Sequence, residues 1–131
     1  MQNILMRKSL HHAMVYNAKT EIKDPIKWGI SGISLYPFYN PKSEGFVGAY
    51  ADVLRATKHT AIGFKGNKVY LIESDKSLTL DDFRKGLLNS RIAFDGLINL
   101  DGGGSTQMTF GGKKLISSVR VLNHHIRLLN V

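Results

Sequence analysis

The feature that most constrains this chain is a run of three glycines that follows a short apolar segment, Leu97-Ile98. An apolar run that stops at glycines predicts a buried strand that ends there. Because glycine has no side chain and tolerates positive φ, another group can lie directly against the backbone of such a loop. Polar residues flank the glycines and suit an oxygen-rich ligand, so the sequence predicts a strand that ends in a binding loop. The whole stretch reads Asn99-Leu100-Asp101-Gly102-Gly103-Gly104-Ser105-Thr106.

Size and composition predict one domain that covers residues 1–131. Hydrophobic residues make up 43% of the chain, which is enough for a core and excludes a chain disordered by composition. The absence of cysteine excludes disulfides, thiolate metal sites and a cysteine nucleophile. No apolar stretch reaches the roughly 20 residues that cross a bilayer, and the N-terminus lacks the pattern of a signal peptide. We therefore expect a cytoplasmic protein without a membrane partner.

The chain carries a formal net charge of +8. A basic surface attracts anions, which range from nucleic acids to phosphorylated sugars and nucleotides. The lysines and arginines are scattered, and they form no dense block with interleaved aromatic residues, so a nucleic-acid partner is not expected. A small anionic ligand, either a sugar phosphate or a nucleotide-like molecule, fits this charge better. The distribution of charged residues specifies no oligomeric state.

Local signals are clearest in the second half of the chain. Two β-prone segments, 60–64 and 68–73, are separated by Gly66-Asn67, a pair typical of a tight hairpin turn. Thr79 stands before an acidic first turn and predicts the N-cap of a helix that ends near residue 90. This order of elements, a hairpin followed by a helix, places the glycine run at the end of the next strand.

Other strands are predicted around these elements. They cover residues 10–17, 28–35, 96–100, 107–110, 114–117 and 119–131. In the last of them Leu122, His124, Ile126 and Leu128 share one face by alternation. Residues 37–45 predict a loop, and 46–57 a short helix. The sequence therefore predicts an α+β fold, with a mixed, mostly antiparallel sheet and one or two helices packed on it.

Several motifs occur in an order and spacing that resemble the phosphodiester glycosidase family. They are Thr60-Ala61-Ile62-Gly63, an acid at Asp75, Leu78-Thr79-Leu80 and the stretch 99–106. The resemblance covers roughly residues 59–108. It implies a hydrolase that breaks the bond between the anomeric carbon of a sugar and a phosphate oxygen. Because a cytoplasmic location is expected, soluble phosphorylated sugars or nucleotide-derived molecules are the expected substrates.

The resemblance also implies which residues form the site. Glycosidases commonly use two carboxylates, and here the catalytic candidates are Asp101 and Asp75, with Glu73 in reserve. The backbone amides of the glycine run are expected to hold phosphate oxygens. The implied substrate-binding residues are His59, Thr60, Asn99, Gly102, Gly103, Gly104, Ser105 and Thr106.

The chain departs from the family pattern in three places. His59 stands where the family usually has an arginine, and a histidine is a cation only when it is protonated. Asp75-Lys76-Ser77 replaces an Asp-Gly-Arg, and the family's N-terminal motif is not evident, residues 33–40 being the nearest region. These departures favour a second hypothesis, a non-catalytic protein that binds and retains a phosphorylated sugar or a nucleotide.

The same residues have purely structural interpretations, and no metal site is specified. Asp101 can cap a turn through its own backbone, and the glycine run can be only a turn. The adjacent pairs His11-His12 and His124-His125 would point to opposite faces of a strand, so neither pair chelates one ion readily. A divalent cation is compatible with Asp101 and neighbouring oxygens, but the sequence contains no complete ligand set and specifies no cofactor.

Overall fold

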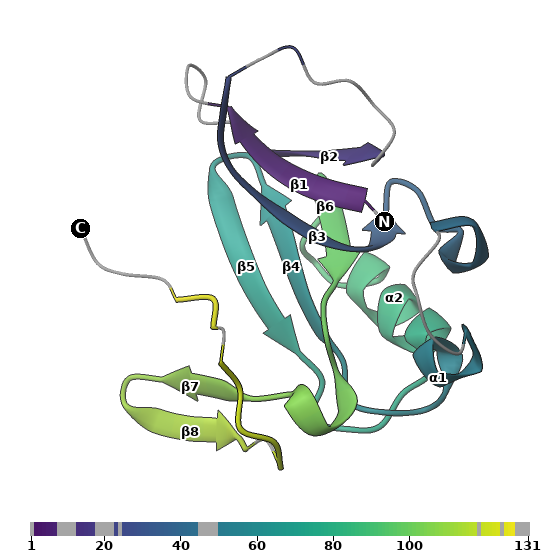
Figure 1. Cartoon of the computed structure of the whole chain (residues 1–131), viewed down its shortest axis with the longest axis vertical. Helices are drawn as coiled ribbons and strands as arrows, with labels where there is room; N and C mark the ends of the chain where they lie inside the picture. Colours follow the sequence, from purple (N-terminus) through teal and green to yellow (C-terminus); the bar gives the residue numbers. More distant parts are fainter. Residues whose placement is uncertain are drawn as a thin grey trace.

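The computed structural model describes residues 2–7, 13–17, 23, 25–44, 50–117, 119–123 and 125–127. Its main element is a six-stranded sheet with the order β2-β1-β3-β6-β4-β5 (Figure 1). The strands are β1 (Gln2–Arg7), β2 (Ala13–Asn17), β3 (Ile26–Tyr36), β4 (Thr60–Lys65), β5 (Lys68–Glu73) and β6 (Gly96–Asn99). The helices are η1 (Pro41–Glu44), α1 (Tyr50–Leu54), α2 (Leu80–Leu88) and η2 (Gly103–Ser105). A separate hairpin pairs β7 (Met108–Phe110) with β8 (Lys113–Ile116).

The predicted α+β class is confirmed, and every strand pair in the described sheet is antiparallel. Strand β6 lies between β3 and β4, so the strand before the glycine run is central, as expected. Its position explains its composition, because a strand covered on both faces needs apolar residues on both. All four residues of β6 are buried.

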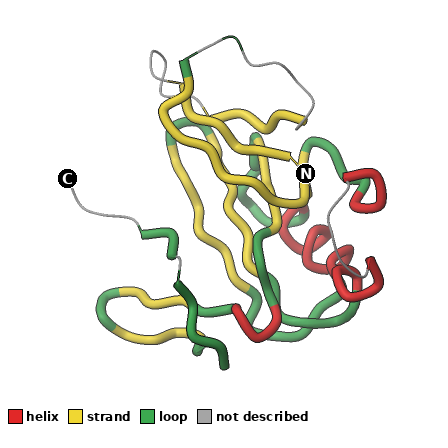
Figure 2. Tube along the Cα trace, in the orientation of Figure 1, coloured by secondary structure: helices red, strands yellow, loops and turns green. Residues whose placement is uncertain are grey.

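The two faces of the sheet are covered differently. Figure 2 shows η1, α1 and α2 together on one side of the sheet, whereas η2 lies apart from them in the loop after β6. On the side that α2 covers, its Leu80 and Phe83 pack against Ala61 and Leu97. The opposite face is built on Ile62, Phe64 and Ile98, with partly buried side chains around them. We call these the helix face and the open face.

Helix α2 begins where the sequence places it. The Thr79 hydroxyl accepts a hydrogen bond from the Asp82 amide at 3.1 Å, which satisfies a donor of the first turn. Asp81 and Asp82 lie near the positive end of the helix dipole. The predicted N-cap is therefore confirmed.

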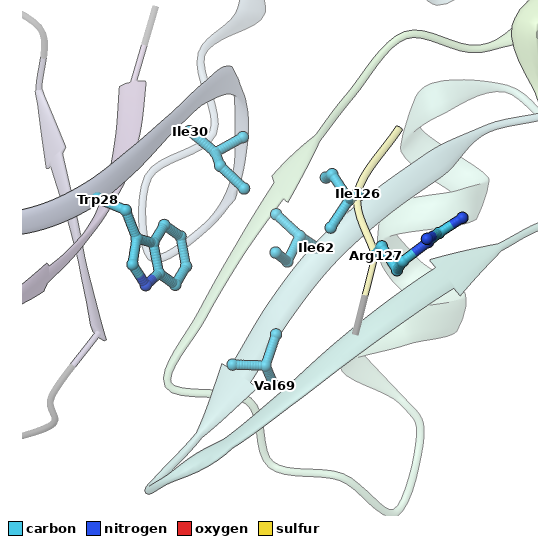
Figure 3. Close-up of a pocket in the computed structure, with 6 residues that line it drawn as sticks. All are labelled: Trp28, Ile30, Ile62, Val69, Ile126 and Arg127. Atoms are coloured by element: carbon cyan, nitrogen blue, oxygen red, sulfur yellow. The ribbon is translucent and has the colours of Figure 1, made fainter. Parts of the chain in front are cut away.

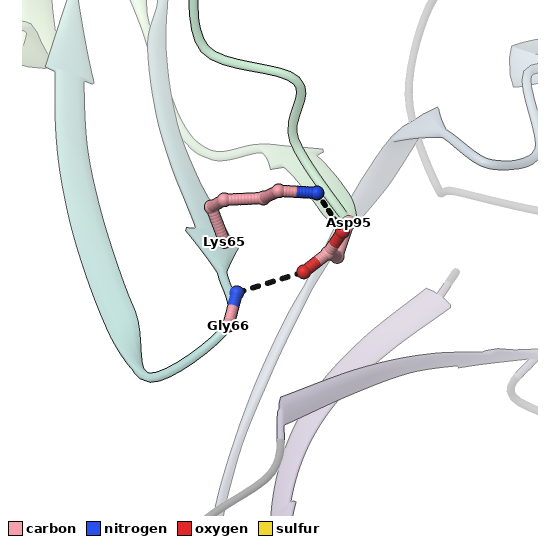
Figure 4. Close-up of polar contacts among 3 residues, drawn as sticks. All are labelled: Lys65, Gly66 and Asp95. Atoms are coloured by element: carbon pink, nitrogen blue, oxygen red, sulfur yellow. Dashed lines mark hydrogen bonds and ion pairs between the residues drawn. The ribbon is translucent and has the colours of Figure 1, made fainter.

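The β4–β5 hairpin is closed by a carboxylate from another part of the chain (Figure 4). Gly66 has φ +56°, a value that favours glycine. Its amide donates to Asp95 Oδ2 at 2.7 Å, and Lys65 Nζ lies 2.7 Å from Asp95 Oδ1. Asp95, the residue that precedes β6, thus connects that strand to the hairpin turn.

Some expectations are corrected. No strand forms within 119–123 or 125–127, although 119–131 was expected to be one; the other residues of that segment lie outside the described part. Val119 and Val121 are 89% and 95% exposed, so the alternation of apolar and polar residues in this segment does not bury these two side chains. The helix expected over 46–57 covers only Tyr50–Leu54, and the loop expected over 37–45 contains η1; residues 45–49 are not described.

At the N-terminus, β1 was not anticipated from the sequence. It pairs with both β2 and β3, so two other strands stabilise it. Of the strand expected over 10–17, residues 13–17 form β2, and 10–12 lie outside the described residues. In the described part of the chain, no helix combines the length and the apolar character that crossing a membrane requires.

Candidate active site

The glycine run lies at one edge of the sheet, where β5 and β6 end and β4 begins (Figure 1). Thr60, the first residue of β4, pairs with Glu73, the last residue of β5. On its other side, the Thr60 carbonyl accepts a hydrogen bond from the Leu100 amide at 2.8 Å. The antiparallel order of these three strands therefore brings the predicted motifs to one edge.

The loop after β6 is held against the segment that enters β4. The Gly103 amide donates to the Lys58 carbonyl at 2.8 Å, and the Thr106 hydroxyl lies 3.4 Å from the same oxygen. A Cβ on Gly102 would stand 2.6 Å from that carbonyl oxygen, closer than side chains approach. Gly103 has φ +60°, which favours glycine. Two of the glycines are therefore required by the loop's own geometry.

Asp101 both closes the turn and remains exposed. Its Oδ1 accepts a hydrogen bond from the Gly102 amide at 2.9 Å. The Thr60 hydroxyl donates to its backbone carbonyl, which joins β4 to the loop. Asp101 thus caps the turn through Oδ1, as the structural interpretation expects. Its side chain is nevertheless exposed and accessible to a ligand.

Hydrogen bonds within the loop determine which groups remain for a ligand. The Gly102 and Gly103 amides both donate inside the protein, to Asp101 and to Lys58. The Ser105 and Thr106 amides donate to the carbonyls of Gly102 and Gly103, and both of these side chains are buried. In this arrangement Ser105 and Thr106 support the loop from beneath.

His59 and Asn99 lie on the helix face of the sheet, opposite the face that carries Thr60. His59 is 3% exposed, its ring stacks on Phe83 with centroids 5.2 Å apart, and its Nε2 lies 2.8 Å from the Leu78 carbonyl. Burial lowers the pKa of this imidazole, and the hydrogen bond to Leu78 offsets part of that effect. Asn99 is buried and pairs with Ala61 of the helix-face core; its Nδ2 donates to the Leu100 carbonyl at 2.8 Å.

The two acids at the end of β5 differ in their surroundings. Asp75 is exposed in the turn that follows, and no hydrogen bond or ion pair joins it to another described residue. Glu73 is partly buried, and both of its carboxylate oxygens are buried without a hydrogen-bond partner in the described structure. Burial raises the pKa of Glu73, and the charge of Lys58 lowers it in part. From the sequence, Asp75 was named as a catalytic candidate and Glu73 was kept in reserve. Alternation along β5 was the available signal for Glu73, because it puts Glu73 on the same face as the apolar residues Val69 and Leu71.

A cleft of about 290 Å³ lies on the open face of the sheet (Figure 3). Strands β3, β4 and β5 and the C-terminal segment supply its lining: Trp28, Ile30, Ile62, Val69, Ile126 and Arg127. Figure 3 shows the Arg127 guanidinium directed away from the apolar residues. This cleft was not anticipated, because residues 126 and 127 were assigned to a strand; the period-two placement of Trp28 and Ile30 was the available signal.

The sequence matches the phosphodiester glycosidase family across residues 13–127. The chain belongs to this family. The match is much wider than the resemblance seen over 59–108, and it includes the N-terminal half in which no family motif was evident. No curated protein and no solved structure gives a significant match.

The chemistry of a phosphodiester glycosidase sets what an active site of this family must supply. Positive charge develops on the sugar ring and negative charge on the departing phosphate, so carboxylates and an anion-binding group are both required. At the sheet edge where the glycine run lies, Glu73 ends β5, Asp101 follows β6 and Lys58 precedes β4, while Asp75 lies in the turn two residues after Glu73. Among the described residues, no three acids or histidines gather as they would around a metal ion.

Proposed function

We propose that the chain hydrolyses a phosphodiester glycoside and releases the free sugar and a phosphate monoester. Two observations support the proposal: membership of the phosphodiester glycosidase family and the meeting of Thr60, Asp101 and the acids that end β5 at one sheet edge. The second of these carries most weight for the location. Here hydrogen bonds and strand pairing join β4, β5 and β6 around a loop that leaves no room for a Cβ at Gly102 and favours glycine at Gly103.

In the proposed reaction Asp101 contacts the substrate first. Its exposed side chain accepts hydrogen bonds from sugar hydroxyls, while the Gly102 amide fixes the position of Oδ1. The glycine run and Thr60 form the surface on which the sugar phosphate lies, and the buried Ser105 and Thr106 support it from beneath. His59 and Asn99 support this surface from the helix face. A second carboxylate is needed, and Asp75 and Glu73 are the two candidates at the end of β5.

A small anionic substrate with a planar group beyond the phosphate fits the open face. Trp28 offers an aromatic surface in the cleft, and base stacking on aromatic side chains contributes about 1–3 kcal/mol. Arg127 adds positive charge at the cleft's rim, and the net charge of +8 favours anions generally. A nucleoside diphosphate sugar has this combination of groups.

The bond that breaks provides the decisive test. The protein is incubated in ¹⁸O-labelled water with a hexose 1-(methyl phosphate) or with a nucleoside diphosphate hexose. Cleavage at the anomeric carbon places ¹⁸O in the sugar, whereas cleavage at phosphorus places it in the phosphate. Label in the phosphate, or no product from either compound, would overturn the proposed reaction.

Substitution then separates catalysis from binding. We expect Asp101→Ala to reduce turnover by about 10²–10⁴-fold, because it removes a charged group at the reacting sugar. Trp28→Ala should raise KM for the nucleotide sugar by about tenfold and leave the methyl diester unaffected. If both compounds bind to the wild-type protein without turnover, the chain is instead a non-catalytic binding protein of the same family.

A further inference from the structure

Glu73 is partly buried, and its two carboxylate oxygens are buried without a hydrogen-bond partner in the part of the chain that the structure describes. Hydrogen bonds normally satisfy the polar atoms that a protein buries, and leaving a charged group without them is costly. A group that the described residues leave unsatisfied at this cost suggests a use outside the fold.

A second buried glutamate in the same chain shows the contrast. Glu44 of η1 is also buried, but the Ser34 amide donates to its two oxygens, at 3.2 and 3.0 Å. Burial raises the pKa of Glu44, and that hydrogen bond lowers it in part. Among the described residues, the Glu44 carboxylate therefore has a structural partner and the Glu73 carboxylate has none.

The position of Glu73 relates it to both parts of the proposed substrate. Directly opposed residues of antiparallel strands share a face, so Glu73 and Thr60 lie side by side on the open face. The Thr60 hydroxyl in turn donates to the Asp101 carbonyl. Two residues further along β4, at about 7 Å, Ile62 lies on the same face and lines the cleft. Glu73 thus lies between the loop and the cleft.

We propose that Glu73 is the general base of the phosphodiester glycosidase, the carboxylate that takes a proton from the attacking water. This inference rests on the proposed function and names Glu73, in place of Asp75, as the second carboxylate. Water oxygen bonds to the anomeric carbon while the bond from that carbon to the phosphate oxygen breaks. The electron pair of the broken bond stays on the phosphate, and the water proton moves to a Glu73 oxygen and then to solvent.

The surroundings of Glu73 suit a base better than an acid. A phosphate monoester leaves readily without a proton, so an acid contributes little to this departure. A carboxylate in a poorly solvated position holds a proton more strongly, and it interacts more strongly with positive charge on the sugar. Among the described residues, the charge that acts on Glu73 is that of Lys58 before β4; Asp101 lies after β6, Arg120 lies beside Gly104, and Arg127 lines the cleft.

The test compares Glu73→Gln, Glu73→Asp and the control Glu44→Gln, with a hexose 1-(methyl phosphate) as substrate. Glu73→Gln should lower kcat by about 10²–10⁴-fold and change KM by less than about threefold. Glu73→Asp keeps the charge and should retain part of the activity. The wild-type acid limb of kcat/KM should lie above the pKa of an ordinary glutamate and disappear in Glu73→Gln. Glu44→Gln should leave both kcat and the acid limb unchanged.

Unfolding in urea supplies a readout that needs no turnover. Because the described residues offer the buried Glu73 oxygens no hydrogen bond, we expect Glu73→Gln to unfold at a higher urea concentration than the wild-type protein at neutral pH. A lower midpoint would show that Glu73 stabilises the fold, and it would overturn the assignment. Wild-type-like kcat in Glu73→Gln would overturn the base alone, whereas a wild-type protein that leaves the bond at the anomeric carbon intact would overturn the proposed function as well.

Discussion

The two ends of the β4–β5 hairpin use carboxylates in opposite ways. At the turn, Asp95 is largely exposed, and both of its oxygens have partners, the Gly66 amide and the Lys65 ammonium. At the other end, Glu73 has two buried oxygens and no partner among the described residues. The pKa of Asp95 is lowered, first by the Gly66 amide, whereas burial raises the pKa of Glu73.

We call the turn the structural end of the hairpin, and the end with Glu73, where the active site is proposed, the functional end. Hydrogen bonds to an ionised carboxylate stabilise both the charge and the turn that supplies them. A buried carboxylate without such bonds costs stability when it ionises, and that cost is typical of catalytic groups. The same sheet therefore has one end that favours folding and one end whose arrangement favours chemistry.

The largest effect is expected from adding one methyl group at the functional end. Gly102→Ala would place Cβ 2.6 Å from the Lys58 carbonyl oxygen, so the loop must shift and its hydrogen bonds to the segment before β4 must weaken. We expect a loss of about 2–3 kcal/mol in the free energy of unfolding. Turnover should be lost as well. Urea unfolding and the sugar-release assay measure the two effects.

Gly66→Ala is the matched control at the structural end. Gly66 also has positive φ, +56°, but no atom lies within 4 Å of its Cβ position. Alanine there should cost about 1 kcal/mol, from backbone conformation alone, and leave turnover unchanged. Equal stability losses in the two variants would show that close approach to Lys58 is not what requires glycine at position 102.

The next effect concerns the sign of the pH dependence of stability. The pKa of Asp95 is lower in the folded state, so its contribution is present above its unfolded pKa and is lost as pH falls through the folded pKa. The pKa of Glu73 is raised, so stability is greatest below its unfolded pKa and declines as pH rises toward the folded pKa.

Urea unfolding over a range of pH tests these signs with two variants. Asp95→Asn should be less stable than wild type at neutral pH, by about 1 kcal/mol, because a charge-assisted hydrogen bond is weakened. Glu73→Gln should be more stable there. Both differences should shrink in acid, where the wild-type carboxyls are protonated. If the two differences have the same sign at neutral pH, the contrast between the ends is wrong.

The smallest effect is expected for the ion pair at the turn. The Lys65 and Asp95 side chains are 48% and 42% exposed, so solvent screens their attraction. Lys65→Met should change the free energy of unfolding by less than about 0.5 kcal/mol. Added salt should change the wild-type value equally little. A loss larger than that for Asp95→Asn would make the ion pair, and not the Gly66 amide, the main support of the turn.

Local patterns in the sequence predicted the elements that short-range physics controls. The turn at Gly66, the N-cap at Thr79 and the central strand before the glycines depend on neighbouring residues, and all three are confirmed. The strand expected over 119–131 does not form in the described residues of that segment. Alternation favours a strand only where a neighbouring strand pairs with its backbone. The family motifs were likewise recognisable in the sequence only where their residues follow one another directly, within residues 59–108.

The sequence by itself determined the fold class, the glycine loop and the family to which the chain belongs. Only the tertiary structure decided how the candidate residues are divided: Thr60 and Glu73 share the open face, while His59 and Asn99 point into the helix face. The reason is that side-chain direction follows strand register, and register is set by pairing between segments far apart in the chain. The burial of the Glu73 oxygens without a partner among the described residues is a property of that assembled environment, and no local pattern encodes it.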